Sequence, residues 1–194
     1  MSGNIVVIPE INSEAIGMGK KALLIIDVQM AMFTGETHVY RDVEVLNNIT
    51  AMLDKARASG MPAIFVQHTV PGYARFEKGS PTWEINPGIK PLANEDVIEK
   101  SYCDSFMDTK LESVLKGKGI TELIIAGMQT EYCVDTSVRR AFSMGYRNIL
   151  VSDAHTTYDN EALKADQIIR HHNSVWNGCF AELKTTEEVL QGEF

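Results

Sequence analysis

The strongest constraint on the fold is a repeated alternation of short apolar runs with longer amphipathic segments. Residues 21–27 read Lys-Ala-Leu-Leu-Ile-Ile-Asp, which has the length and composition of a buried strand. Residues 43–59 then carry apolar side chains at helical spacing, and Gly60 ends that predicted helix. Strands that alternate with helices require right-handed crossovers, and these produce a parallel sheet with helices on both faces.

The alternation continues along the chain and indicates one α/β domain. Residues 1–20 lie outside it and predict an N-terminal arm, which leaves residues 21–194 as the domain. Residues 70–94 show no periodicity and are rich in proline, glycine and aromatic residues, which is typical of a long functional loop. The further strands are expected over 63–67, 97–100, 122–126, 148–152 and 180–183, and the further helices over 109–116, 131–144 and 161–172.

Composition and charge exclude several classes of partner. The formal net charge of -8 repels phosphate backbones, so we expect no nucleic-acid partner. No apolar run reaches membrane-spanning length, and the N-terminus lacks the pattern of a secretory signal, so no membrane association is expected. The three cysteines form a sparse, odd set, which favours free thiols in a reducing compartment and a cytoplasmic location.

Three residues with complementary chemistry fall at the carboxyl ends of predicted strands. Asp27 closes the first strand, Lys100 closes the strand over 97–100, and Cys133 follows the strand over 122–126 at the start of the next helix. Ligands of doubly wound sheets bind at this edge, so the coincidence predicts a catalytic site there. Polar residues also close strands in proteins without such a site, and the pattern alone does not decide between the two.

Each of the three has a catalytic and a structural interpretation. A thiol at a helix N-terminus, near an ammonium group, is favoured as a thiolate nucleophile, but Cys133 could equally be a small buried apolar residue. Asp27 could accept the thiol proton and later protonate a leaving amine, or it could cap the following helix. Lys100 could offset negative charge in the transition state, or lie solvated at the surface.

The residues around these positions carry a family resemblance. The segment Leu24-Ile25-Ile26-Asp27-Val28-Gln29 with Phe33, then Lys100 with Phe106, then Gly127-Met128-Gln129-Thr130-Glu131-Tyr132-Cys133-Val134 resembles the isochorismatase-like cysteine hydrolases. The three motifs occur in order and span nearly the whole domain. The resemblance implies a three-layer α/β/α sandwich around a mainly parallel six-stranded sheet, which agrees with the alternation.

The resemblance also implies roles for individual residues. Asp27 is the implied acid/base, Lys100 the electrostatic partner and Cys133 the nucleophile. A cis peptide bond is implied between Met128 and Gln129, and the backbone amides of Gln129 and Cys133 would form the oxyanion hole. The implied reaction is hydrolysis of an amide-type C–N bond of a small molecule through a thioester.

The sequence also discriminates between branches of this family. Nicotinamidases bind a metal through an Asp-x-His pair and a further histidine, whereas this chain reads Val66-Gln67-His68-Thr69 at the matching strand end. We therefore expect no metal and no cofactor. The resemblance is greatest to general amidohydrolases such as the streptothricin-hydrolase-like proteins. The run His171-His172-Asn173 adds to that likeness, although a helix end followed by a capped turn is the better explanation of the run.

Aromatic residues at the same edge are candidate walls of the substrate site, and two other activities stay open. An isochorismatase-type vinyl-ether hydrolase would not need the thiol, and a redox protein would use Cys133 as a sensing thiol, with Cys103 as its resolving partner if the two lie close. The family usually forms oligomers, so we expect a homodimer or homotetramer.

The candidate substrate-binding residues are Phe33, His68, Trp83, Tyr102, Phe106 and Tyr158.

Overall fold

The computed structural model describes residues 19–192 and contains a six-stranded sheet in the order β3-β2-β1-β4-β5-β6. Every neighbouring pair of strands is parallel. The fold class is therefore the predicted α/β sandwich, with a sheet that is parallel throughout. The strands are β1 (Lys20–Ile26), β2 (Ala63–His68), β3 (Asp96–Lys100), β4 (Ile120–Met128), β5 (Arg147–Thr156) and β6 (Glu182–Lys184).

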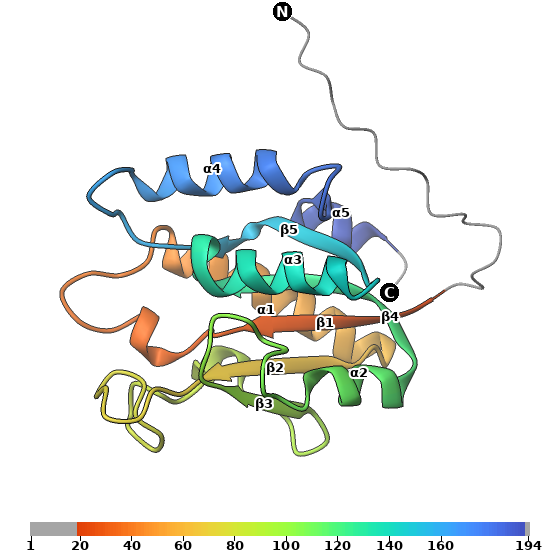
Figure 1. The fold of residues 1–194 in the computed structure, drawn as a ribbon, viewed down its shortest axis with the longest axis horizontal. Coiled ribbons are helices and arrows are strands. Elements are labelled where there is room, and N and C mark those ends of the chain that lie inside the picture. The colour runs from red at the N-terminus through yellow and green to blue at the C-terminus, as the bar shows by residue number, and fades with distance from the viewer. Residues whose placement is uncertain (1–18, 193–194) are drawn as a thin grey trace, which may run out of the picture.

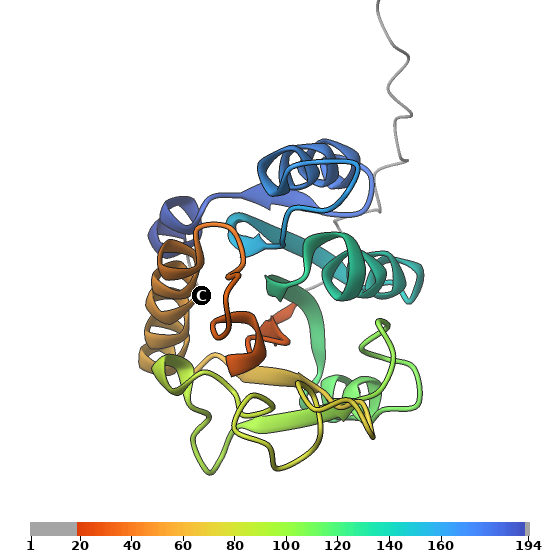
Figure 2. The ribbon, with the colours of Figure 1, turned by 90° about the vertical axis from the view of Figure 1, so that its left-hand side faces the viewer.

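Helices cover both faces of the sheet, as Figures 1 and 2 show. Buried residues of α1 and α5 belong to the apolar cluster on one face, and those of α2, α3 and α4 belong to the cluster on the other. The helices are α1 (Asp42–Ser59), α2 (Leu111–Lys118), α3 (Asp135–Ser143), α4 (Ala165–Trp176) and α5 (Thr186–Gln191), with short turns at η2 (Met30–Met32), η3 (Pro87–Ile89) and η4 (Thr130–Val134).

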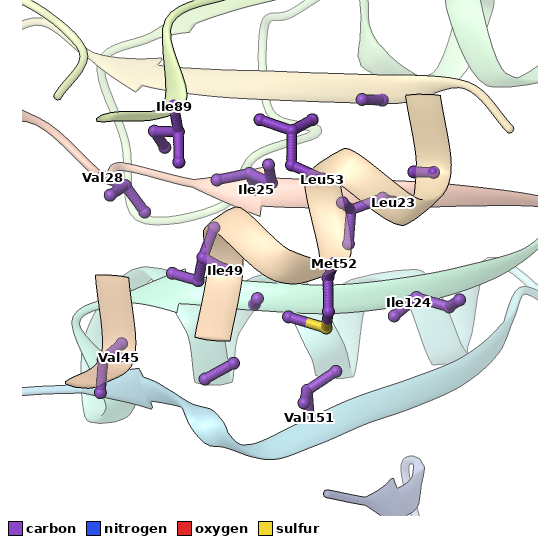
Figure 3. Packing of buried hydrophobic residues seen from close by; sticks show 14 of the residues in the cluster. Leu23, Ile25, Val28, Val45, Ile49, Met52, Leu53, Ile89, Ile124 and Val151 are labelled. Atoms are coloured by element: carbon purple, nitrogen blue, oxygen red, sulfur yellow. The ribbon is translucent and has the colours of Figure 1, made fainter. Parts of the chain in front are cut away.

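Strand β1 is central and is buried on both sides. Leu23 and Ile25 pack in the cluster beneath α1, whereas Leu24 and Ile26 pack in the cluster on the opposite face. Figure 3 shows the first of these clusters, in which Met52 and its neighbours on α1 lie over the sheet. A strand buried on both faces needs an unbroken apolar run, and this is why residues 22–26 contain no polar side chain.

The main departures from the predicted elements lie in the second half of the chain. The predicted helix over 131–144 begins instead as the π-helical turn η4, and α3 starts only at Asp135. Strand β5 runs to Thr156, four residues beyond the predicted end, because its pairing with β4 shifts register between Ile125 and Gly127. The short helix α5 was not predicted, since six residues are too few to show a helical period.

Two other expectations have different outcomes. The N-terminal arm lies almost entirely outside the described residues, and β1 begins at Lys20, the last residue assigned to that arm. Within residues 19–192, none of the helices has the length and apolar character needed to cross a membrane.

Candidate active site

The topology itself defines a crevice at one end of the sheet. The chain moves from β1 outward to β2 and β3, then returns to place β4 on the other side of β1. Helix α1 lies on one face and α2 on the other, so the connections diverge at the boundary between β1 and β4. Ligands of such sheets bind at this switch point, outside the carboxyl ends of the strands, which face the viewer in Figure 2.

Asp27 and Lys100 meet at this point in a buried ion pair. Lys100 Nζ lies 2.6 Å from Asp27 Oδ2, and both side chains are almost completely shielded from solvent. Asp27 follows β1 with a φ of 53°, a left-handed conformation that is uncommon for a residue with a side chain. Charged groups are rarely buried unless they are paired, so this pair indicates a site in which the charge is used.

Two further atoms hold the ammonium group of Lys100 in place. Its Nζ donates to the backbone carbonyl of Tyr102 at 3.0 Å and lies 3.2 Å from His68 Nδ1. Burial is the largest single influence on the pKa of Lys100 and lowers it, but Asp27 and Cys133 together raise the pKa overall. Burial, followed by the charge of Lys100, lowers the pKa of His68, so this histidine is a neutral acceptor for the ammonium group.

Cys133 completes the cluster from the turn η4. Its Sγ, a carboxylate oxygen of Asp27 and a ring nitrogen of His68 all lie within 4.8 Å of one another. Asp27 Oδ1 is buried and has no hydrogen-bond partner within the part of the chain that the structure describes, so it is an available acceptor for the thiol proton. The structure thus brings the predicted Asp27, Lys100 and Cys133 together.

The protonation of Cys133 differs from the expectation. We expected the helix N-terminus and Lys100 to favour a thiolate. Instead the pKa of Cys133 is raised, because its thiol is hydrogen-bonded to that of Cys103, is buried and lies beside the carboxylate of Asp27. Lys100 opposes this shift without reversing it. The thiol of Cys133 is therefore neutral at rest and would need a base to act as a nucleophile.

A glycine lets the two central strands approach closely beside this cluster. Gly127 has a φ of 135°, and a Cβ atom there would lie 2.1 Å from the carbonyl oxygen of Ile26. Only glycine allows this contact, which sets the end of β4 against the residue before Asp27. Two residues on from Gly127, the peptide bond Met128–Gln129 is cis, at the position that the resemblance implies.

His155 and Gln29 support the site, and neither role could be predicted from a clear sequence pattern. His155 Nδ1 lies 2.9 Å from Thr130 Oγ1 and its Nε2 2.9 Å from Asn173 Oδ1, which joins η4 to α4. Burial lowers the pKa of His155 to about 4, so it is neutral. Gln29 accepts from the amide of His68 and donates to two carbonyl groups, which fixes the end of β2. The position of Gln29 in the Asp27 motif was the available signal.

The six predicted wall residues are not equally placed. His68 lies at the catalytic cluster, and its ring packs edge-on against Phe76. Tyr102 contributes its carbonyl group to Lys100 while its side chain is exposed. The Trp83 indole donates to Thr69 Oγ1 at 2.9 Å. Phe33 is half-buried against the core beneath α1.

Phe106 is placed differently from the other wall candidates. Its side chain is 7% exposed, and its ring lies 5.9 Å from that of Tyr146 within the apolar cluster beneath α2 and α3. Phe106 therefore packs in the same apolar cluster as Cys133, and its role as a wall of the substrate site stays a prediction.

Tyr158 lines a cavity of about 500 Å³ at the same edge of the sheet. Its hydroxyl group lies 3.9 Å from Met32 Sδ, which in turn lies 3.7 Å from Gln129 Nε2. The cavity is thus separated from Gln129 by the side chain of Met32. The residues that line it are Thr37, His38, Tyr40, Arg75, Tyr158 and Asp159.

The cluster contains three potential metal ligands, from Asp27, His68 and Cys133. The ammonium group of Lys100 already lies against two of them, at 2.6 Å from the carboxylate and 3.2 Å from the imidazole. A divalent cation would have to displace a buried positive charge to bind there. The arrangement fits an acid–base and nucleophile site better than a metal centre.

Comparison with known proteins agrees with this geometry. The isochorismatase domain family matches residues 21–188. Streptothricin hydrolase of Streptomyces noursei is 35% identical over 139 residues, which are 72% of this chain and 50% of that protein, so the chain spans about half its length. Ureidoacrylate amidohydrolase RutB of Yersinia enterocolitica is 27% identical over 169 residues, 69% of this chain and 74% of that protein.

The solved structures agree with the family match. The crystal structure of an isochorismatase from Pseudomonas putida KT2440 has a TM-score of 0.83 and 36% sequence identity, and the match covers 86% of this chain and 88% of that one. The fold, the strand-end cluster and the family match over nearly the whole described chain point to one assignment. This chain belongs to the isochorismatase family of hydrolases.

Proposed function

We propose that this protein is a cysteine amidohydrolase that cleaves an amide-type C–N bond of a small molecule through a thioester. The observation that carries the proposal is the buried Asp27–Lys100 ion pair, with the thiol of Cys133 next to its carboxylate. A neutral thiol, a base and a fixed positive charge are the groups that acyl transfer to sulfur requires. The relatives named as a hydrolase and an amidohydrolase support the same chemistry.

In the proposed reaction Asp27 first takes the proton of Cys133, and the resulting thiolate attacks the substrate carbonyl. The backbone amides of Gln129 and Cys133 stabilise the oxyanion. Asp27 then protonates the departing amine, which leaves a thioester on Cys133. Water, deprotonated by the same carboxylate, attacks the thioester and releases the acid. The raised pKa of Cys133 makes the first proton transfer a necessary step.

Lys100 has a definite part in this scheme. Its ammonium group is 2.6 Å from Asp27 and is shielded from water, so it stabilises the ionised carboxylate before the proton transfer. When Asp27 becomes neutral and the thiolate forms, the same positive charge stabilises the sulfur anion. Lys100 therefore lets the proton move from sulfur to oxygen while the site keeps one compensated negative charge.

The cavity beside Tyr158 is the proposed entrance for substrate. Its three ionisable lining residues differ in their partners: Asp159 is paired with Lys164 at 2.7 Å and His38 with Asp42 at 2.9 Å. Arg75 forms no ion pair within residues 19–192 and donates to the hydroxyl group of Tyr158 at 3.4 Å. A guanidinium group without an acidic partner suits a substrate that carries a carboxylate or another anionic group.

The proposal is tested by amine or ammonia release from a panel of small amides, ureas and hydroxamates, half of them with a carboxylate. The Cys133→Ala variant is the paired negative, and Cys179→Ala is the matched control because Cys179 lies outside the cluster. We expect release by the native protein and by Cys179→Ala, and none by Cys133→Ala.

Full turnover by Cys133→Ala would exclude the thioester route and favour a hydrolysis, such as that of a vinyl ether, that needs no thiol.

The homo-oligomeric state and the cytoplasmic location stay predictions. Light scattering on the purified protein separates a 21.6 kDa monomer from a dimer or tetramer.

A further inference from the structure

A second thiol lies against the proposed nucleophile, and the proposed hydrolysis does not use it. The side chains of Cys103 and Cys133 lie close enough for each thiol to shift the pKa of the other. Cys103 is exposed, whereas Cys133 is buried at 9% exposure. The pair therefore consists of one thiol that solvent reaches and one that it barely reaches.

The backbone around Cys103 is fixed to α3, the helix that directly follows the turn η4 with Cys133. Ser137, one turn beyond Cys133, donates to the carbonyl of Cys103 at 3.4 Å, and its hydroxyl group lies 2.7 Å from that of Ser105. The hydroxyl of Ser137 also accepts from the amide of Ser105 at 3.1 Å. These bonds between completely buried serines hold the loop over α3, so the contact between the thiols is built into the fold.

The two thiols also differ in their readiness to react. The hydrogen bond from Cys133 and the charge of Lys100 lower the pKa of Cys103 to about 6, against the effect of partial burial. Of the two thiols, Cys103 is therefore the one that loses its proton more readily. An exposed thiolate is the form of cysteine that hydroperoxides oxidise most readily.

We propose that Cys103 and Cys133 form a hydroperoxide-reactive dithiol site, in which Cys103 is oxidised first and Cys133 resolves it as a disulfide. The observation behind it is that a loop anchored at Ser137 holds the exposed thiol of Cys103 beside the buried thiol of Cys133. A Cys103–Cys133 disulfide would also block amide hydrolysis. That consequence rests on the proposed function of Cys133, whereas the redox reaction itself does not.

The reaction balances with a hydroperoxide as the oxidant. The sulfur of Cys103 attacks the O–O bond, and the products are a sulfenic acid on Cys103 and the alcohol, or water when the oxidant is hydrogen peroxide. The sulfur of Cys133 then attacks the sulfenic sulfur, the S–O bond breaks, and the hydroxyl group leaves with the Cys133 proton as water. Two electrons from the thiols reduce one peroxide, and an external thiol restores the pair.

The closing motion is small. The thiols already lie beside each other, and residues 101–110 form bends and turns without a helix or strand, so the side chains can reach bonding distance by local adjustment. Cys179 has no part in the site. It follows α4, far along the chain from Cys103 and Cys133, and it is not among the groups that shift the pKa of either thiol.

The test treats the reduced, full-length protein with one equivalent of hydrogen peroxide and maps its tryptic peptides without reduction. Cys103 lies in peptide 101–110, Cys133 in peptide 119–139 and Cys179 in peptide 171–184, so each pairing has its own mass. We expect linked peptides 101–110 and 119–139. Peroxide consumption should fall at least about tenfold in Cys103→Ser and stay unchanged in Cys179→Ser, because only the first substitution removes the activated thiolate.

The peptide map of the native protein tests whether the Cys103–Cys133 disulfide forms, even if a variant folds poorly. Peroxide treatment that leaves peptides 101–110 and 119–139 unlinked, or that oxidises Cys133 to sulfinic acid without a link, would overturn the proposal, and so would equal consumption by native protein and Cys103→Ser. The map needs no turnover, so a protein that fails to hydrolyse amides can still pass this test. A linked protein that loses amide hydrolysis and regains it with dithiothreitol connects the two functions.

Discussion

At the scale of single residues, the Asp27–Lys100 pair is the part of the site with the largest energetic consequence. Both groups are buried, so removing either charge leaves the other without compensation in a medium of low polarity. The sequence predicted that these two residues and Cys133 would share one edge, because the ends of parallel strands meet there. It could not predict that the carboxylate and the ammonium group would be in direct contact, because that distance depends on the Gly127 approach and the turn at Asp27.

We predict that Asp27→Asn loses at least about 10³-fold in kcat, because an amide cannot accept the thiol proton. The alkylation of Cys133 by iodoacetamide should slow in parallel, as the thiol loses its base. Both are measured at pH 7.5, with alkylation read from peptide 119–139. Asp166→Asn is the control, since Asp166 is paired with Arg170 at the surface of α4. Unchanged alkylation in Asp27→Asn would show that Asp27 is not the base.

His155 predicts a pH dependence of stability. Its pKa is about 4 in the folded protein, lowered first by burial, against about 6.5 in an unfolded chain. Between these values the unfolded state binds a proton that the folded state does not, so stability is complete above pH 6.5 and is lost as the pH falls toward 4.

The expected loss from this histidine is about 2 kcal/mol between pH 7.5 and pH 5. The measurement is the free energy of unfolding in urea at both pH values, in native protein and in His155→Gln. The variant should be less stable at pH 7.5, because the bonds to Thr130 and Asn173 change, but its loss on acidification should be smaller. His171→Gln serves as the control, and an identical acid loss in native protein and His155→Gln would contradict the argument.

At the scale of elements, the regular strands and helices could be predicted from the sequence, whereas the irregular segments between them could not. The strand over residues 21–27 and the helix over residues 43–59 were predicted to within one residue. The strand is buried on both faces and therefore shows an unbroken apolar run, whereas the helix is buried along one side and shows apolar residues at helical spacing. The π-turn η4 and the register shift of β5 left no such period. Both lie next to the catalytic cluster, where the geometry serves the site and departs from the regular hydrogen-bond pattern.

Gly127 ties one of these irregular elements to the core, and its replacement should be costly. A Cβ at Gly127 would lie 2.1 Å from the carbonyl oxygen of Ile26, so β1 and β4 would have to separate at the centre of the sheet. We predict that Gly127→Ala loses about 3 kcal/mol or more of stability, from the clash together with the positive φ.

Thermal and urea unfolding check this prediction. Gly145→Ala is a matched control, because Gly145 also has a positive φ, 89°, but no heavy atom lies within 4 Å of a Cβ built there. That variant should lose only about 1 kcal/mol. The difference between the two isolates the contact with Ile26. Equal losses in both would assign the cost to backbone conformation alone.

At the scale of the whole molecule, the order of the strands determined where the site had to be, and the loops determined its chemistry. The alternation of strands and helices implied a switch point, and β1 and β4 form it. The loop over residues 101–110 and the cavity at Tyr158 come from segments without periodicity. Their contacts join residues far apart in the chain, such as Ser105 with Ser137 or Arg75 with Tyr158, and such contacts cannot be derived from local pattern.

Charge at this scale gives the last prediction. The chain carries a net charge of -8, so an anionic substrate approaches against the overall field and needs a local positive group to be held. Arg75 is the lining residue of the cavity that supplies one, since within residues 19–192 it has no acidic partner. Arg75→Gln should therefore raise KM for a carboxylate-bearing amide at least about tenfold and change KM for a neutral analogue little, because a desolvated charge-assisted bond contributes about 1.5–3 kcal/mol.

The comparison needs variants that separate charge from structure. Arg75→Lys keeps the positive charge and should recover part of the affinity, whereas Lys78→Gln removes a nearby surface charge that is already paired with Glu99 and should change neither KM. Measuring both substrates on each variant makes the ratio of the two KM values the readout. If Arg75→Gln raised both KM values equally, Arg75 would act by holding its loop against Ala31, and the substrate would not be selected by its charge.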